Sequence, residues 1–234
     1  MARTKKHEKI EQSENGNGSA ADLPFADRCL SPPEIYSVYL WGPPGIGKSY
    51  IAQRRGRVEQ GVYNLSLSDE TPSAELRGFW MPEKDGFVWR DGPAVMAMRE
   101  GARLCIQELG HASPDVMAFL HPILESRETA LLTLPTGETV VPAEGFHVVA
   151  TSNDPPTHLP LALRDRFDCV IRLGAPHPEA LARLSERLRQ AALRTFELEP
   201  ERAISLRAWL KLQDLEPVMG LEDGCRAVFG EERG

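Results

Sequence analysis

The run of eight residues from 42 to 49 carries the glycines, the lysine and the hydroxyl that a phosphate-binding loop requires. Its glycines allow the backbone to turn tightly and to bring amide groups up to phosphate oxygens. Lys48 supplies a positive charge for the β- and γ-phosphates, and Ser49 supplies a hydroxyl that can ligate Mg²⁺. The sequence therefore predicts nucleotide binding by Gly42, Pro43, Pro44, Gly45, Ile46, Gly47, Lys48, Ser49 and Tyr50.

A second motif follows the apolar stretch 103–106, where the chain continues as Gln107 and Glu108. If this stretch is a strand, both residues lie at the carboxyl edge of a sheet, where ligands bind. We therefore expect Glu108 to act as the general base that activates an attacking water. Gln107 stands where an aspartate is expected, so it can hold Mg²⁺ only through a bound water and without charge. This substitution predicts weaker metal binding and leaves slow hydrolysis open.

A third polar residue, Asn153, follows the apolar stretch 146–151. From an adjacent strand its amide can orient a water or contact the γ-phosphate. Asparagine is also a common turn residue, and here it precedes Asp154 and two prolines. Taken with the other two motifs, Asn153 is a candidate site residue.

The elements that position these residues alternate along the chain. Short apolar runs typical of buried strands occupy 37–41, 62–67, 103–107, 146–151 and 169–173, and helical stretches lie between them. This alternation predicts a parallel three-layer αβα sheet with right-handed crossovers. The clearest helix is predicted to begin at an N-cap, Ser113, and to be interrupted at Pro122.

Two segments do not fit simple crossovers, because each contains two short strand patterns around a turn. Residues 77–94 surround the dipeptide Asp85-Gly86, and residues 131–141 surround Pro135-Thr136-Gly137. Each segment is predicted to be a β-hairpin inserted into the core.

Three parts are predicted along the chain: a disordered arm at 1–22, the nucleotide-binding core at 23–175 and a small helical lid at 176–234. In the lid we expect one helix from Pro178, with Leu181, Leu184 and Leu188 on one face. A second helix is expected from Ser205 and a short third one around 225–229.

The composition narrows the classes of function. The 234 residues carry a net charge of −7, which argues against tight, non-specific binding to nucleic acid. No apolar run approaches the roughly 20 residues that cross a bilayer, and no membrane association is expected. The four cysteines are far apart and are expected to be free thiols. These features predict a cytoplasmic protein.

The order of motifs resembles the AAA+ ATPases, specifically the MoxR-like, dynein-related branch. The resemblance covers roughly residues 35–230. Its motifs are the loop at 42–49, the runs at 71–78 and 91–94, Gln107-Glu108, Asn153 and the Leu-Arg-Asp-Arg-Phe run at 163–167. The two inserted hairpins also fall where that branch carries its insertions.

The resemblance implies three arginine roles. Arg166 matches the arginine finger that reaches into a neighbouring subunit's site, with Arg164 as the second candidate. Arg207 matches the sensor arginine of the lid. The resemblance also implies ATP and Mg²⁺, a hexameric ring and a partner that often bears a von Willebrand factor A domain. The segment 25–35 is short for enclosing adenine, so GTP stays open beside ATP.

Three functions follow from these expectations. The first is a ring-forming ATPase that remodels a protein client. The second is a nucleotide-dependent switch or scaffold with little hydrolysis, which Gln107 favours. The third, a DNA motor, is disfavoured by the acidic balance.

Overall fold

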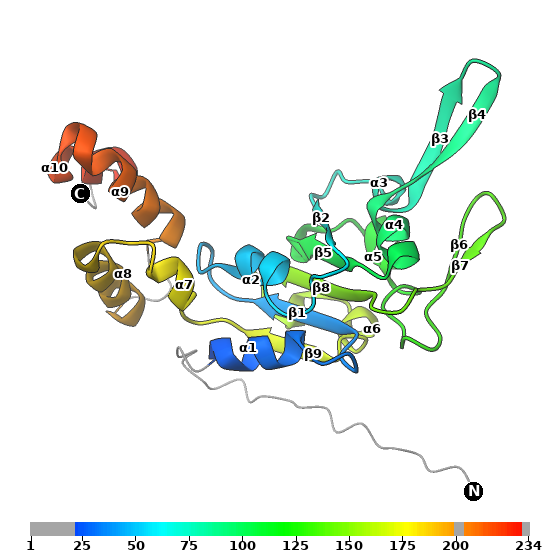
Figure 1. Ribbon diagram of the computed structural model, residues 1–234, viewed down its shortest axis with the longest axis horizontal. Helices are drawn as coiled ribbons and strands as arrows, with labels where there is room; N and C mark the ends of the chain where they lie inside the picture. The colour runs from blue at the N-terminus through cyan, green and yellow to red at the C-terminus, as the bar shows by residue number, and fades with distance from the viewer. Residues whose placement is uncertain (1–21, 199–203, 231–234) are drawn as a thin grey trace, which may run out of the picture.

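A computed structural model describes residues 22–198 and 204–230 of the chain (Figure 1). Its centre is a five-stranded sheet in which every neighbouring pair of strands is parallel. The strand order is β2-β5-β8-β1-β9, and the bounds are β1 Ser37–Trp41, β2 Val62–Ser66, β5 Arg103–Gln107, β8 His147–Ser152 and β9 Cys169–Arg172. The five predicted strands and the parallel αβα sheet are confirmed.

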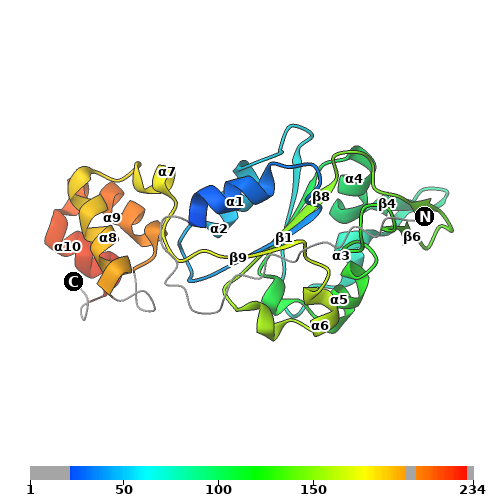
Figure 2. The same cartoon turned by 90° about the horizontal axis from the view of Figure 1, so that it is seen from below.

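Both faces of this sheet are covered, because alternate side chains of each buried strand point to opposite sides. Val38 and Leu40 pack with Ile51 and Leu30, whereas Tyr39 packs in the cluster on the other face. Figure 2 shows α1 and α2 on one side of β1 and β9, and α5 and α6 on the other. The helix bounds are α1 Asp22–Leu30, α2 Lys48–Arg54, α3 Ser73–Arg77, α4 Pro93–Glu100, α5 Pro114–Leu120 and α6 Leu161–Arg164, with 3₁₀ turns at Leu109–His111 and Pro156–His158.

The two predicted hairpins are present as separate two-stranded sheets. The first pairs β3 Gly78–Glu83 with β4 Gly86–Asp91, and the second pairs β6 Leu132–Thr133 with β7 Thr139–Val140. Both extend away from the sheet at the end of the molecule opposite the last three helices (Figure 1). The predicted N-cap of α5 is also confirmed, since the Ser113 hydroxyl accepts from the amide of Val116.

The start of the helical region after β9 differs from the prediction. Instead of one helix from Pro178, the chain forms α7 Pro178–Leu181 and α8 Glu186–Leu198. The Arg189 guanidinium donates to the carbonyls of Leu181 and Leu184, and the Gln213 side chain accepts from the amide of Ser185. These contacts stabilise a break between the helices, although the three predicted leucines still share one core cluster.

The final helices are α9 Leu206–Met219, which begins after the predicted N-cap Ser205, and α10 Leu221–Phe229. The second of these includes the predicted short helix around 225–229 and begins earlier, at Leu221. Within the described ranges, no helix combines the length and the apolar character needed to cross a membrane.

Helix α1 was not among the predicted elements. It starts at Asp22, the last residue of the predicted arm, and the rest of that arm (1–21) lies outside the described residues. Ala26, Cys29 and Leu30 bury its inner face against the sheet, at the spacing of an amphipathic helix. That spacing was the available signal, although nine residues give a weak pattern.

Candidate nucleotide site

The loop between β1 and α2 requires its glycines. Gly42, Gly45 and Gly47 have φ values of 148°, 77° and 98°, in the region that other residues rarely adopt. Space is equally restrictive, because a Cβ on Gly42 would lie 2.1 Å from the carbonyl oxygen of Leu173. On Gly45 it would lie 2.1 Å from the Cβ of Ser205. The loop is therefore held against the chain that leads into the lid.

The loop also presents unpaired amides. Across 22–198 and 204–230, no carbonyl outside the helices accepts from the backbone amides of residues 45–49. Helix α2 begins at Lys48, so these amides gather at its positive end. Such amides fit phosphate oxygens, which are acceptors only.

Lys48 is buried beneath this loop. Its ammonium donates to the carbonyls of Gly42 and Pro43, each at 2.8 Å, and to Oδ1 of Asn153 at 2.7 Å. Burial lowers the pKa of Lys48 to about 8, and the nearby Glu108 carboxylate opposes that effect. A phosphate in the loop would supply the negative charge that this ammonium otherwise finds only in Glu108.

Asn153 connects Lys48 to Glu108. Its Nδ2 donates to Oε2 of Glu108 at 3.1 Å, while its Oδ1 accepts from Lys48. The three residues follow β1, β8 and β5, which lie next to one another in the sheet. The predicted meeting of these side chains at the carboxyl edge is thus present in the structure, as one hydrogen-bonded chain.

Glu108 has a strained backbone. Its φ of 58° and ψ of 42° place it in the left-handed region, and no other described residue except glycine has a positive φ. A left-handed conformation is unfavourable for a residue with a Cβ, and such strain is concentrated at functional sites. The backbone here turns sharply at the end of β5 and points the carboxylate at Asn153.

The residues expected near Mg²⁺ form a weakly charged set. Ser49 is half-buried, and no described residue hydrogen-bonds to its hydroxyl. Gln107 donates from Nε2 to Oδ1 of Asn64 at 2.6 Å, and Gln53 donates to the same atom at 3.1 Å. The available oxygens are therefore a hydroxyl, an amide and the Glu108 carboxylate. This set fits Mg²⁺ that keeps several waters and also contacts nucleotide phosphates.

The structure separates Arg166 from the loop. The backbone carbonyl of Arg166 accepts from the hydroxyl of Ser37, at the start of β1, whereas the loop follows the end of β1. Five residues of strand span roughly 15 Å. The Arg166 guanidinium donates to Oε1 of Glu125, from Nε at 2.8 Å and from Nη2 at 2.5 Å. Arg164 is half-buried, and its side chain has no hydrogen-bond partner within the described residues.

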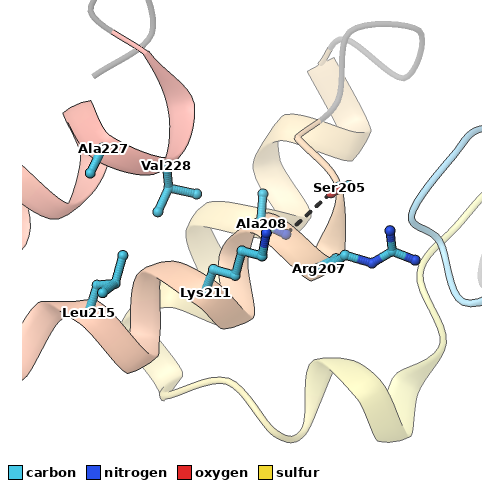
Figure 3. Close-up of a pocket in the computed structure, with 7 residues that line it drawn as sticks. All are labelled: Ser205, Arg207, Ala208, Lys211, Leu215, Ala227 and Val228. Atoms are coloured by element: carbon cyan, nitrogen blue, oxygen red, sulfur yellow. Dashed lines mark hydrogen bonds between the residues drawn. The ribbon is translucent and has the colours of Figure 1, made fainter.

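Arg207 lies in the first turn of α9, next to the loop. The amide of its neighbour Leu206 donates to the carbonyl of Gly45 at 3.1 Å. In Figure 3 the exposed Arg207 side chain extends away from Leu215 and Val228. A pocket of about 350 Å³ between α9 and α10 is lined by Ser205, Arg207, Ala208, Lys211, Leu215, Ala227 and Val228. This pocket belongs to the lid and not to the phosphate loop.

Sequence reasoning missed the residues that support these groups. Asn64 holds Gln107, Glu125 holds Arg166, and Glu179 accepts from Tyr50 and Arg55, each at 2.7 Å. The ring of Tyr50 also packs against His177, with ring centroids 5.2 Å apart. These partners are 41 to 129 residues apart in sequence, so no local pattern signals them.

Comparison with known proteins identifies the family. The family model described as the AAA domain of the dynein-related subfamily matches residues 37–167, more than half of the chain. The chain belongs to the AAA+ family. The expected MoxR-like, dynein-related branch is confirmed, and with it membership in a family of nucleotide hydrolases that bind ATP.

Named relatives of this AAA+ chain include one protein from Paracoccus denitrificans and one from Pseudomonas aeruginosa. Protein NorQ of Paracoccus denitrificans is 35% identical over 117 residues, which are 50% of this chain and 43% of NorQ. The denitrification regulatory protein NirQ of Pseudomonas aeruginosa is 32% identical over 152 residues, which are 63% of this chain and 58% of NirQ. The chain thus spans about half the length of these two relatives.

Two further matches extend over most of the AAA+ chain. An uncharacterised protein of Staphylococcus haemolyticus, SH1500, is 30% identical over 220 residues, covering 82% of each chain. A crystal structure from Cytophaga hutchinsonii superposes with a TM-score of 0.50 at 17% identity, covering 85% of this chain and 59% of that one. At this identity the second match shows a shared fold.

Proposed function

We propose that this AAA+ chain hydrolyses ATP, and that it does so in a ring whose subunits remodel a protein partner. The observation that carries the proposal is the hydrogen-bonded chain from Lys48 through Asn153 to Glu108. It places a cation for phosphate, a polar amide and a candidate base at one edge of the sheet. A binding loop alone would not need the last two.

Each residue has a distinct part in this proposal. The free amides of residues 45–49 and the Lys48 ammonium hold the β- and γ-phosphates. Ser49 would ligate Mg²⁺, which would neutralise phosphate charge, and Gln107 would hold that ion only through a water. Glu108 accepts a proton from the attacking water, while Asn153 orients Glu108. We expect the bound nucleotide to be ATP, as in the family, and GTP is the competing nucleotide.

The arginine geometry supports action between subunits. Arg166 lies at the opposite end of β1 from the loop, so it does not reach the site of its own chain. In a ring, Arg166 or Arg164 of one subunit contacts the γ-phosphate bound by the next and stabilises charge during transfer. Arg207 reaches from the lid to the γ-phosphate bound by its own chain. A hexamer is the assembly that we expect.

The protein partner is proposed from relatives and from the shape of the molecule. One relative carries the name denitrification regulatory protein, which indicates a role exerted on other components. The β3–β4 hairpin exposes Phe79, Trp80 and Phe87, an apolar surface suited to contact with a client. The partner that we expect bears a von Willebrand factor A domain, and we expect this chain to act in the cytoplasm.

A steady-state ATPase titration tests the ring. Phosphate release per subunit should rise with protein concentration and should require Mg²⁺. Arg164→Ala and Arg166→Ala identify the arginine that acts in trans. Replacing that arginine should lower phosphate release roughly 1,000-fold or more. Glu125→Ala is the matched control, since it removes the Arg166 partner and keeps the guanidinium. Turnover that is constant with concentration and insensitive to both arginine variants would rule out the ring mechanism.

A nucleotide-dependent switch is the second candidate, and the contact of Gln107 with Asn64 favours it. With an amide in place of the usual aspartate, the chain would bind Mg²⁺-nucleotide with negligible turnover. Gln107→Asp should then raise phosphate release by tenfold or more, and Gln107→Ala should not. Ordinary turnover by the unmodified chain would eliminate the switch.

A further inference from the structure

Two of the four cysteines meet where α1 covers the edge strand of the sheet. Cys29 lies near the end of α1 and is 5% exposed, whereas Cys169 is the first residue of β9 and is half-buried. Cys29 belongs to the buried cluster that packs α1 and α2 against the sheet, and Cys169 packs against the same cluster. Strand β9 is the last in the order β2-β5-β8-β1-β9, so this contact lies at the margin of the fold.

The two thiols interact directly. A hydrogen bond between their side chains lowers the pKa of Cys29, and the positive charge of Arg28 acts in the same direction. The same contact raises the pKa of Cys169, and burial adds to that effect. One sulfur of the pair is therefore the preferred thiolate, and the other is its adjacent proton donor.

The other two cysteines lack this arrangement. Cys105 is fully buried in β5, and burial raises its pKa to about 12. Cys225 lies on α10 in the lid and packs beside the lid cluster. Neither belongs to a thiol pair within the described residues, so they serve as internal references for the pair at α1.

We propose that Cys29 and Cys169 form a dithiol that a hydroperoxide oxidises to a disulfide joining α1 to β9. Cys29 first loses its proton to solvent, and the resulting thiolate attacks an oxygen of hydrogen peroxide. The O–O bond breaks, and the hydroxide that leaves takes a proton from solvent to become water. The Cys169 sulfur then attacks the Cys29 sulfenic acid. The S–O bond breaks and a second water leaves with the Cys169 proton. The two thiols lose two electrons, and one molecule of hydrogen peroxide becomes two waters.

The disulfide would constrain α1, a helix that is linked by ion pairs to the end of α2 and, through it, to the lid. Asp27, on α1, pairs with Arg55, at the end of α2, and Arg55 also pairs with Glu179 in the lid. A disulfide at Cys29 would fix α1 to β9 and close a long loop of the chain. The oxidised protein should therefore unfold at a temperature several degrees higher than the reduced protein.

The experiment treats the reduced full chain with hydrogen peroxide and quenches it with an alkylating agent. Thiols counted under denaturing conditions should fall from four to two. Tryptic digestion should yield residues 29–48 joined to residues 167–172, at a mass two hydrogens below their sum. A reductant should restore all four thiols. Cys29→Ser and Cys169→Ser should each abolish the joined peptide, while Cys225→Ser, the matched control, should retain it.

Three results would overturn the dithiol. The thiol count could stay at four under conditions in which the same peroxide oxidises free cysteine added to the sample. The lost thiols could instead be recovered as sulfinic or sulfonic acids without a joined peptide. Finally, the joined peptides could contain Cys105 or Cys225. Because the joined peptide is measured in the unmodified chain, the test does not depend on the folding of any variant or on ATP hydrolysis.

Discussion

The residue Glu108 shows how the backbone and a side chain act together at this site. Its left-handed conformation turns the chain at the end of β5, and its carboxylate then accepts from Asn153. The position between Gln107 and Leu109 was evident from the sequence, and so was the role expected of a carboxylate there. The left-handed turn was not, because glutamate has no preference for it.

The first prediction at this scale separates the backbone strain at Glu108 from the role of its carboxylate as proton acceptor. Asn tolerates the left-handed region better than Glu, so Glu108→Asn should leave the unfolding free energy unchanged or raise it by up to about 1 kcal/mol. Phosphate release should fall by roughly 100-fold or more, because the proton acceptor is lost. Thermal unfolding and a phosphate assay measure the two effects. The exposed control Glu128→Asn should change neither, and turnover kept by Glu108→Asn would refute the role of the base.

The second prediction concerns the proton on Lys48. Its pKa of about 8 lies below the ordinary value of 10.5, because the ammonium is buried. Nucleotide phosphates favour the charged form, so binding at pH 8.5 should take up a proton. Affinity should be flat below pH 8 and should fall by up to tenfold per pH unit above it. Calorimetry in two buffers of different ionisation enthalpy measures the uptake.

The control for this titration is Lys48→Met, which should bind more weakly and take up no proton. Identical binding heats in both buffers at pH 8.5 would show that Lys48 is charged before the nucleotide arrives. That result would contradict the effect of burial on this lysine.

At the scale of elements, the β3–β4 hairpin has an exposed tip and an anchored base. Phe87 is 70% exposed, whereas Trp89 packs against the core cluster and donates from Nε1 to Asp91 at 2.7 Å. The hairpin was predictable from Asp85-Gly86, since that dipeptide favours a tight turn. The sequence showed that the hairpin is rich in aromatic residues. It did not show which of them are exposed and which pack against the core.

The third prediction uses this contrast. Phe87→Ser should change the unfolding free energy by no more than about 0.5 kcal/mol, since its ring contacts mostly solvent. Trp89→Ser should reduce it by about 1 to 3 kcal/mol, since packing and a hydrogen bond are both lost. Urea denaturation of the two variants measures the difference. Equal losses would mean that the tip of the hairpin is packed in solution.

The helices of the lid mark the limit of local prediction. Ser205 is an N-cap that the sequence identifies directly, because its side chain bonds within its own turn. The break between α7 and α8 depends on Gln213, which contacts Ser185 from 28 residues away. Local signals thus place the start of a helix, and distant contacts decide where one helix becomes two.

At the scale of the whole molecule, the lid contacts the phosphate loop and the helix α2 that follows it. The amide of Leu206 donates to the carbonyl of Gly45, and Glu179 accepts from Tyr50 and Arg55. The sequence predicted the loop and the lid separately. It did not predict these contacts, because they join residues more than 100 positions apart.

The fourth prediction follows from these contacts. Glu179→Ala removes the lid carboxylate that accepts from both Tyr50 and Arg55, so the lid should separate more often from the loop. Amide hydrogen exchange in a peptide covering Leu206 should accelerate by less than tenfold, as expected for an exposed ion pair. Glu186→Ala, which removes only a pair within α8, is the control. Unchanged exchange in Glu179→Ala would show that the backbone contacts of the lid with Gly45 and Ile46 hold it without Glu179.

Arg103 and His147 determine how accurately the nucleotide site is aligned. They are opposite each other at the first position of β5 and β8, where Nε of the fully buried Arg103 donates to Nε2 of His147 at 2.7 Å. The same two strands deliver Glu108 and Asn153 at their far ends. A slip of one residue would separate both pairs at once. The register of the two strands is thus fixed at one end, and the site residues lie at the other end. The relative position of Glu108 and Asn153 therefore depends on a contact roughly 15 Å away from them.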